Sequence, residues 1–309
     1  MEEIVFGFGA LSSIDEKLEL LSLAQLADRE GLDVISFSDQ PFMGDRLDAY
    51  AALGFVLGAT RHLNGFVNVT NLPSRPAVML SRTVATLSAL SDGRFVLGIG
   101  AGRASGNESG MWDRITDMGV SPLSPGDAVD ALEEAIVLVK KLSGGGSPVT
   151  HSGRRYQVRE VEPAPGPAPL VWTGSVGPKS LAATGRLADG WLPGYAADWL
   201  STRYRESRPV IDEAAASAGR DPREIRTVFN VPGRITDQPL AATRGQDGEW
   251  LGGSVDQWVE ELTVAVLEHG ASGFMLWTYE RGAPDEVSLG RWAAEIAPAV
   301  REAVAKNGG

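Results

Sequence analysis

The sequence predicts a (β/α)8 barrel with insertion loops, an α/β fold in which eight helices surround eight parallel strands. Short apolar runs typical of buried strands alternate with longer segments of helical periodicity along nearly the whole chain. The length of 309 residues suits such a barrel. The alternation contains no further internal repeat and no linker, so we expect a single domain over residues 1–309.

Eight segments are expected to form the barrel strands. Each is a short run rich in Val, Ile, Leu or Phe that ends in residues favouring a turn. In chain order the predicted strands are residues 4–9, 33–39, 64–71, 94–100, 169–175, 189–195, 225–231 and 272–279.

The segments between these strands have the spacing of amphipathic helices. In the first of them, Ile14, Leu18 and Leu21 share one face, and Gly31 follows as a C-terminal cap. The predicted helices cover residues 14–31, 48–60, 77–90, 127–142, 178–188, 199–219, 255–270 and 286–304.

Three segments are insertions into this pattern. Residues 101–125 form a long polar loop after the fourth strand, and loops of that length in a compact domain are often functional. Residues 147–162 contain VTHSGRRYQV, which predicts a small hairpin. Residues 236–253 follow the seventh strand.

The composition excludes several function classes. The chain has no cysteine, which rules out disulfides, thiolate metal sites and a cysteine nucleophile. Its three histidines are far apart in the sequence, so we expect no metal site, and this scarcity of histidine argues against the alternative of a metal-dependent barrel hydrolase. The net charge of −12, with both signs interspersed, disfavours nucleic acid and anionic membranes as partners.

The chain also lacks the sequence signals of membrane insertion and export. No apolar run approaches the roughly 18 to 20 residues of a membrane span. The first residues, MEEIVFGFG, have no basic region of the kind that begins a secretory signal. We therefore expect a cytoplasmic protein that acts on a small-molecule substrate.

The glycines of LSDGRFVLGIGAGR suggest a dinucleotide-binding turn, but that interpretation fails. The Rossmann pattern needs a third glycine at the start of a helix. Here that position is Arg103, and the polar segment ASGNESG follows it. The stretch is better explained as a strand that ends in a glycine-lined loop.

In a (β/α)8 barrel, the active site is built from the loops at the carboxyl ends of the strands. This rule selects Asp39 and Gln40 after the second strand, and Asn68 and Thr70 at the end of the third. It also selects Gly102 and Arg103 after the fourth strand and Thr173 to Lys179 after the fifth. Asp39, Glu108, Tyr195 and Tyr279 are candidate acids at this end. Alternatively, Asp39 is a turn or N-cap aspartate before Pro41.

The segment TGSVGPKS is the sharpest local signal for a ligand. Its small residues lie between a strand and a helix, where exposed backbone N–H groups and the helix dipole suit a phosphate. Lys179 adds a positive charge in the first helical turn. The alternative is a tight turn capped by Ser175, with no ligand.

Four segments together point to a known family: LSDGRFVLGIGAGR, VWTGSVGPKSLAATGRLADGWLP, SDQPF and NVTNLPSRPAVMLSRTVATL. Over nearly its whole length the chain resembles the bacterial luciferase-like flavin- and deazaflavin-dependent oxidoreductases. The resemblance implies a (β/α)8 barrel with insertions, and it implies FMN or the deazaflavin F420 with its ring in the barrel mouth. A homodimer is expected as well, because dimerisation is common in the family.

The resemblance also assigns roles to individual residues. The family turn Ser-Asp-His, which contacts the ring, corresponds to Ser38, Asp39 and Gln40, so the aspartate matches and the histidine does not. Gln40 can hydrogen-bond but cannot act as a general base. A non-prolyl cis peptide behind the ring is expected at Val67–Asn68.

The remaining implied contacts concern the cofactor tail. The phosphate is expected on the backbone amides of Gly174, Ser175, Val176 and Gly177, and Gly102 and Arg103 match the loop beside the tail.

The cofactor decides the reaction class. F420 implies hydride transfer to or from a small organic substrate, whereas reduced FMN implies oxygen activation and monooxygenation. The Gly- and Ala-rich composition is of an actinobacterial style, in which F420 is common, and this favours F420. FMN-dependent monooxygenation and a non-catalytic flavin-binding role are the alternatives.

Overall fold

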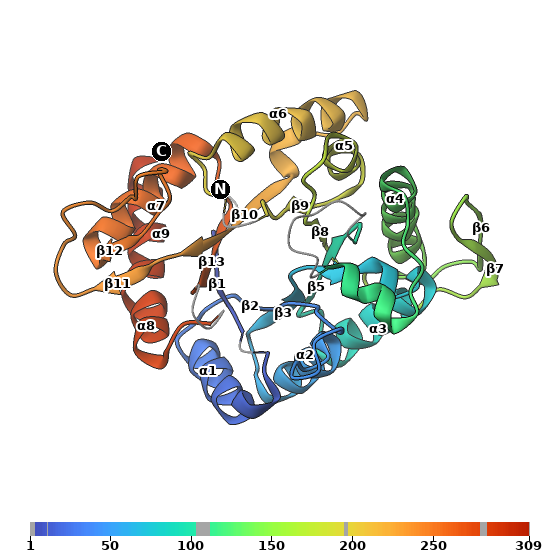
Figure 1. The fold of residues 1–309 in the computed structure, drawn as a ribbon, viewed down its shortest axis with the longest axis horizontal. Helices are drawn as coiled ribbons and strands as arrows, with labels where there is room; N and C mark the ends of the chain where they lie inside the picture. Colours follow the sequence, from blue (N-terminus) through green and yellow to red (C-terminus); the bar gives the residue numbers. More distant parts are fainter. Residues whose placement is uncertain (1–3, 11, 103–111, 195–196, 279–282, 309) are drawn as a thin grey trace.

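Eight parallel strands close into a barrel with helices on the outside, as predicted (Figure 1). The computed structural model describes residues 4–10, 12–102, 112–194, 197–278 and 283–308. The barrel strands are β1 (Val5–Gly9), β2 (Val34–Phe37), β3 (Asn64–Val67), β5 (Phe95–Gly100), β8 (Val171–Thr173), β9 (Gly190–Trp191), β10 (Arg226–Pro232) and β13 (Gly273–Trp277).

The strand order runs β3-β2-β1-β13-β10-β9-β8-β5, and the pairing of β5 with β3 closes the barrel. The third predicted strand is split, because a short strand β4 (Thr70–Asn71) continues it beyond β3 and pairs with the end of β5. The sixth predicted strand is shorter than expected, since only Gly190 and Trp191 pair with their neighbours.

The helices follow the strands in the predicted alternation. They are α1 (Lys17–Arg29), α2 (Ala49–Ala59), α3 (Ala77–Leu90), α4 (Pro125–Lys141), α5 (Pro178–Leu187), α6 (Thr202–Ser217), α7 (Val255–His269), α8 (Glu286–Arg291) and α9 (Ala297–Asn307). None of those in the described ranges is long and apolar enough to cross a membrane.

Two helices differ from the prediction for identifiable reasons. The helix predicted from residue 199 begins at Thr202, because Ser201 caps it while the buried Trp199 packs edge-on against Phe229 and Phe274. The last helix contains a π-helical segment, Trp292–Ile296, between α8 and α9. There the indole of Trp292 donates to the Gly7 carbonyl at 3.0 Å and ties the helix to the barrel.

Side chains alternate between the two faces of the barrel wall. One apolar cluster draws a residue from every barrel strand or the residue next to it, so it must fill the barrel interior. It contains Val5, Val34, Phe66, Val96, Trp172, Leu192, Val228 and Met275. The residues between these on the strands, such as Phe6, Ile35 and Phe274, pack outward against the helices.

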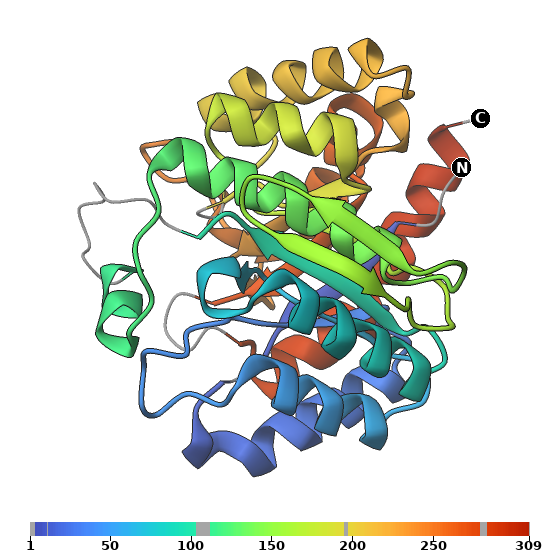
Figure 2. The ribbon, with the colours of Figure 1, turned by 90° about the vertical axis from the view of Figure 1, so that its right-hand side faces the viewer.

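The predicted insertions are present where the structure describes them. Strands β6 (Val149–Ser152) and β7 (Gln157–Val161) form the expected antiparallel hairpin, which lies over α4 (Figure 2). The Glu134 carboxylate of α4 accepts the backbone N–H groups of Arg154, Arg155 and Tyr156 and so anchors the hairpin. The third insertion is closed at its base by β11 (Arg234–Thr236) and β12 (Gly252–Ser254), a parallel pair that the sequence did not predict.

Candidate functional site

The carboxyl ends of the parallel strands bring the predicted residues to one end of the barrel. Asp39 and Gln40 follow β2, Asn68 follows β3, Gly102 follows β5, and Gly174 to Gly177 follow β8. The predicted Arg103, Glu108, Tyr195 and Tyr279 lie outside the described residues.

The third strand changes direction at the mouth. A cis peptide bond joins Asn68 to Val69, one residue after the position expected from the resemblance. Gly100 of β5 and Gly174 after β8 make room for the Val69 side chain. A Cβ at either glycine would lie 2.9 Å from a Val69 methyl group.

The glycines of the fourth strand are used for close packing within the protein. A Cβ at Gly98 would lie 1.9 Å from the Val67 carbonyl oxygen. Gly102 has a φ of +71°, and a Cβ there would lie 2.3 Å from the Pro73 ring. Their absent side chains let the end of the fourth strand pack directly against the end of the third.

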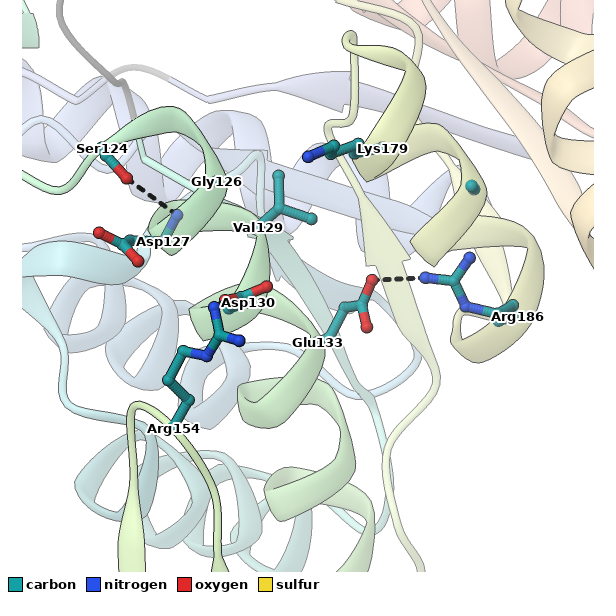
Figure 3. A pocket seen from close by; sticks show the side chains of 10 residues that line it. Ser124, Gly126, Asp127, Val129, Asp130, Glu133, Arg154, Lys179 and Arg186 are labelled. Atoms are coloured by element: carbon teal, nitrogen blue, oxygen red, sulfur yellow. Dashed lines mark hydrogen bonds and ion pairs between the residues drawn. The ribbon is translucent and has the colours of Figure 1, made fainter.

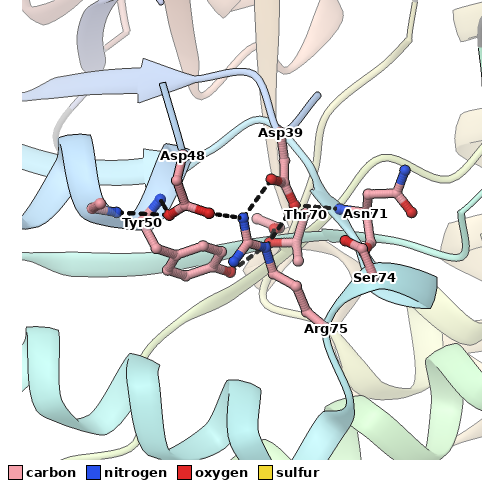
Figure 4. Close-up of polar contacts among 9 residues, drawn as sticks. Asp39, Asp48, Tyr50, Thr70, Asn71, Ser74 and Arg75 are labelled. Carbon is pink, nitrogen blue, oxygen red and sulfur yellow. Dashed lines mark hydrogen bonds and ion pairs between the residues drawn. The ribbon is translucent and has the colours of Figure 1, made fainter. Parts of the chain in front are cut away.

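Asp39 lies in a buried ion pair below the mouth (Figure 4). It is 2% exposed. Its carboxylate accepts hydrogen bonds from Arg75 at 2.7 and 2.9 Å and from the Asn71 backbone N–H at 3.0 Å. With both oxygens occupied, Asp39 holds the turn after β2 to the end of the third strand. The expected catalytic contact of Asp39 with the ring stays a prediction, because its carboxylate is engaged by protein groups here.

Arg75 connects this pair to the start of α2. It also bonds Asp48 at 2.8 Å and stacks over the Tyr50 ring at 4.5 Å. Asp48 caps α2 by accepting the backbone N–H groups of Tyr50 and Ala51. Burial raises the pKa of the Asp48 carboxyl, but the bonds from Arg75 and the cap outweigh it and leave that pKa lowered.

A hydroxyl chain continues from Tyr50 into the barrel wall. The Tyr50 hydroxyl lies 2.6 Å from Thr70 Oγ1, which itself donates to the Gly98 carbonyl at 2.6 Å. Because the Thr70 proton is used there, Tyr50 donates to Thr70. Burial raises the pKa of Tyr50 well above its usual range, so the phenol keeps its proton.

Three residues predicted to bind the cofactor are buried behind the mouth. Val67 and Thr173 are fully buried, and Thr70 is 1% exposed. Val67 packs on the outer face of the barrel, while the two threonine hydroxyls bond within the protein. Their side chains therefore shape the site from behind, and their predicted part in binding the cofactor stays a prediction. The sequence showed their position along the strands but not their partners.

The turn after β8 is held rigidly. Beneath it, the hydroxyls of Thr173, Thr184 and Ser175 form a chain with spacings of 2.6 and 3.0 Å. The Trp191 indole donates to the Ser175 carbonyl at 2.8 Å. Gly177, rather than Ser175, is the N-cap of α5, so the alternative of a Ser175 cap is wrong.

The backbone N–H groups of this turn are only partly occupied. Gly174 donates to the Ile99 carbonyl at 3.0 Å, and Gly177 donates to Ser180 Oγ at 3.2 Å. The N–H groups of Ser175 and Val176 make no hydrogen bond to any residue that the structure describes. Two amides thus remain at the entrance to a helix N-terminus, the setting that favours an anion.

Lys179 lines a surface hollow of about 340 Å³ between α4 and α5 (Figure 3). Its side chain is exposed there, opposite acidic residues of α4. The hollow also contains two ion pairs, Arg154 with Asp130 at 2.9 Å and Arg186 with Glu133 at 2.5 Å.

An amide pair that the sequence did not predict crosses the barrel. Asn68 Nδ2 donates to Asn230 Oδ1 at 2.8 Å, and both residues are partly exposed. Asn68 was selected as a cofactor contact, whereas Asn230 of β10 was missed. Its only signal was a polar residue in the apolar run IRTVFNV. Among the described residues, no group of three or more His, Asp or Glu could hold a metal ion.

Known proteins resemble this chain in sequence and in fold. A family model described as luciferase-like monooxygenase matches residues 7–304. The phthiodiolone/phenolphthiodiolone dimycocerosates ketoreductase of Mycobacterium bovis is 30% identical over 239 residues, which cover 75% of this chain and 56% of that protein. The F420-dependent glucose-6-phosphate dehydrogenase of Microbacterium testaceum is 29% identical over 236 residues, covering 73% of this chain and 67% of the dehydrogenase.

Solved structures share the fold at lower identity. The F420-dependent tetrahydromethanopterin reductase from Methanopyrus kandleri has a TM-score of 0.75 at 18% identity, covering 96% of this chain and 99% of the reductase. The chain spans about half the length of the curated ketoreductases it matches, 46% of one and 56% of another.

Proposed function

Because this chain belongs to the luciferase-like monooxygenase family, we propose that it is an F420-dependent oxidoreductase that transfers a hydride between F420 and a small organic substrate. Family members are oxidoreductases or monooxygenases that use F420 or a flavin. The F420-dependent dehydrogenase with which this chain shares 29% identity is the observation that carries the choice of F420.

The residues at the mouth fit a flat ring with a phosphate-bearing tail. The wall formed by Val69 with Gly100 and Gly174 is apolar and has no bulky side chain. The N–H groups of Ser175 and Val176 suit the phosphate, and they belong to a turn that the hydroxyl chain and Trp191 keep in place.

A buried oxygen of Asn71, near the expected position of the cofactor tail, also suits a bound cofactor. Asn71 is 4% exposed, and its Oδ1 has no hydrogen-bond partner in the described structure. It lies beside Gly102, 3.5 Å from the position of a Cβ there. A buried acceptor without a partner is unfavourable, so we expect a donor from the tail or its loop at this point.

F420, when bound, supplies or accepts the hydride. The protein's contribution is then to hold ring and substrate in register and to exclude water. Asp39 and Arg75 fix the turn that carries Ser38 and Gln40. Ser38 is exposed and Gln40 partly exposed, which leaves both able to hydrogen-bond a ligand. Asp39 is fully engaged, so we assign it no proton transfer.

FMN-dependent monooxygenation is the second candidate, favoured by the description of the family model that matches residues 7–304. Turnover assays distinguish F420-dependent hydride transfer from FMN-dependent monooxygenation. With reduced F420 and a panel of small ketones, recovery of the absorbance of oxidised F420 is expected, with no oxygen consumed. Oxygenation of a substrate that depends on both the protein and reduced FMN, with no turnover of F420, would contradict the proposal. Tight binding of either cofactor without turnover would favour a non-catalytic flavin-binding protein.

A further inference from the structure

The amide bridge between Asn68 and Asn230 spans the full width of the barrel. In the closed order of strands, β3 and β10 are four positions apart in either direction, so they stand on opposite walls (Figure 1). A direct bond of 2.8 Å between their side chains therefore crosses the middle of the barrel.

The bridge divides the barrel into two parts. Two residues earlier on the same strands, Phe66 and Val228 belong to the apolar cluster that fills the interior. Both are fully buried, whereas Asn68 and Asn230 are partly exposed. The amide pair thus forms a floor, with closed apolar core beneath it and the mouth above it.

The bridge leaves hydrogen-bonding capacity unused. A side-chain amide has one acceptor oxygen and two N–H donors. Whichever asparagine donates to the other, one oxygen and one NH2 group stay outside the bridge. Among the described residues, these two side-chain amides make no other hydrogen bond. The floor therefore offers a neutral acceptor beside a neutral donor.

This pairing selects a ligand chemistry. We propose that the Asn68–Asn230 pair binds a lactam edge, an N–H adjacent to a C=O, of the ligand ring. The ring N–H donates to the free amide oxygen, and the ring carbonyl accepts from the free NH2 group. The pyrimidinedione edge shared by flavins and deazaflavins has this chemistry, and a phosphate or carboxylate has not.

The inference rests on the proposed function, because it requires the ring to enter the mouth. It goes beyond that function by naming the group that fixes the ring's orientation. It predicts no preference between F420 and FMN, since both present the same edge. Discrimination between them must come from other residues.

The experiment is a binding comparison between a ring and its N3-methylated form, in which the ring N–H is lost. The wild type is titrated, by fluorescence, with FMN, F420 and the N3-methylated analogue of whichever binds. N3 methylation should weaken binding to the wild type about tenfold, the equivalent of ~1.4 kcal/mol. In the double variant Asn68→Leu/Asn230→Leu the difference should fall below about twofold.

Two further variants guard against effects on folding. Asn230→Leu alone should weaken the binding of the unmethylated ligand about tenfold. This single variant keeps the test open if the double variant does not fold. Asn64→Ala is the matched control, because Asn64 begins β3 at the opposite end of the barrel and donates to the Asp33 carbonyl at 2.9 Å. The Asn64→Ala variant should bind the unmethylated ligand as tightly as the wild type does.

The outcomes separate the two proposals. The role of the amide pair is overturned if N3 methylation weakens binding equally in the wild type and the double variant, or if it does not weaken binding to the wild type. Either result leaves the proposed function standing. A wild type that binds neither FMN nor F420 removes the proposed function, and this inference with it.

Discussion

Replacing Arg75 by methionine should destabilise the protein more than any exposed ion pair could. Asp39 is 2% exposed, and two of the three hydrogen bonds to its carboxylate come from Arg75. Removing one partner of a buried pair costs roughly 3–5 kcal/mol because the other charge stays buried without compensation. The Arg75 side chain is 19% exposed, so water can reach part of the site, and we expect the lower end, about 3 kcal/mol.

The assay is thermal unfolding at neutral pH. Average unfolding entropies imply about 0.65 kcal/mol/K for a chain of this length, so Arg75→Met should lower Tm by about 5 °C. Arg223→Met is the control, since Arg223 is 90% exposed in its pair with Asp221 and should shift Tm by less than about 1 °C. The double variant Asp39→Asn/Arg75→Met should recover part of the loss, because no buried charge then remains. Equal small shifts for Arg75→Met and Arg223→Met would refute the reasoning.

Three further predictions follow from individual contacts. Lys179→Ala should weaken the binding of FMN severalfold more than the binding of riboflavin, since the Lys179 charge lies in the first turn of α5 near the proposed phosphate position. Equal losses of affinity for the two ligands would instead indicate a fold defect. Gly102→Ala should lower Tm, because φ is +71° and the new Cβ would lie 2.3 Å from a proline ring, whereas Gly58→Ala in the helix α2, with open space around it, should not; the reverse order would contradict the packing account. Hydrogen bonds outweigh burial and lower the pKa of the Asp48 and Glu134 carboxyls in the folded chain, so their stabilisation is complete above about pH 5 and is lost as pH falls further; an unchanged Tm between pH 5 and pH 3 would contradict it.

The fold could be predicted because its signals are local. Apolar runs such as RFVLGIG define strands by composition alone, and helices such as α7 carry their own boundaries, a Ser254 cap and Gly270 at a φ of +67°. The breaks were not predictable in the same way. The split between β3 and β4 lies where Val69 packs against Gly100 of β5 and Gly174, which follows β8. The π-helical segment depends on Trp292 reaching the Gly7 carbonyl, 285 positions away in the sequence.

The site was predictable in position and less so in role. The rule for barrel strands led to Asp39, but its partner Arg75 is 36 residues away, and only the folded chain shows the carboxylate to be occupied. The same rule selected Thr70 without showing that its hydroxyl faces the barrel wall. Asn230 was missed because one polar residue in an apolar strand does not reveal a partner on the opposite wall.

The most direct test of the proposed function is a fluorescence titration of the purified apo-protein with F420 and, separately, with FMN. The proposed function predicts tight binding of F420 and binding of FMN at least tenfold weaker. The opposite preference would contradict the choice of F420 and would make this chain a flavin-dependent member of the family. Binding of neither would contradict a cofactor site at the barrel mouth.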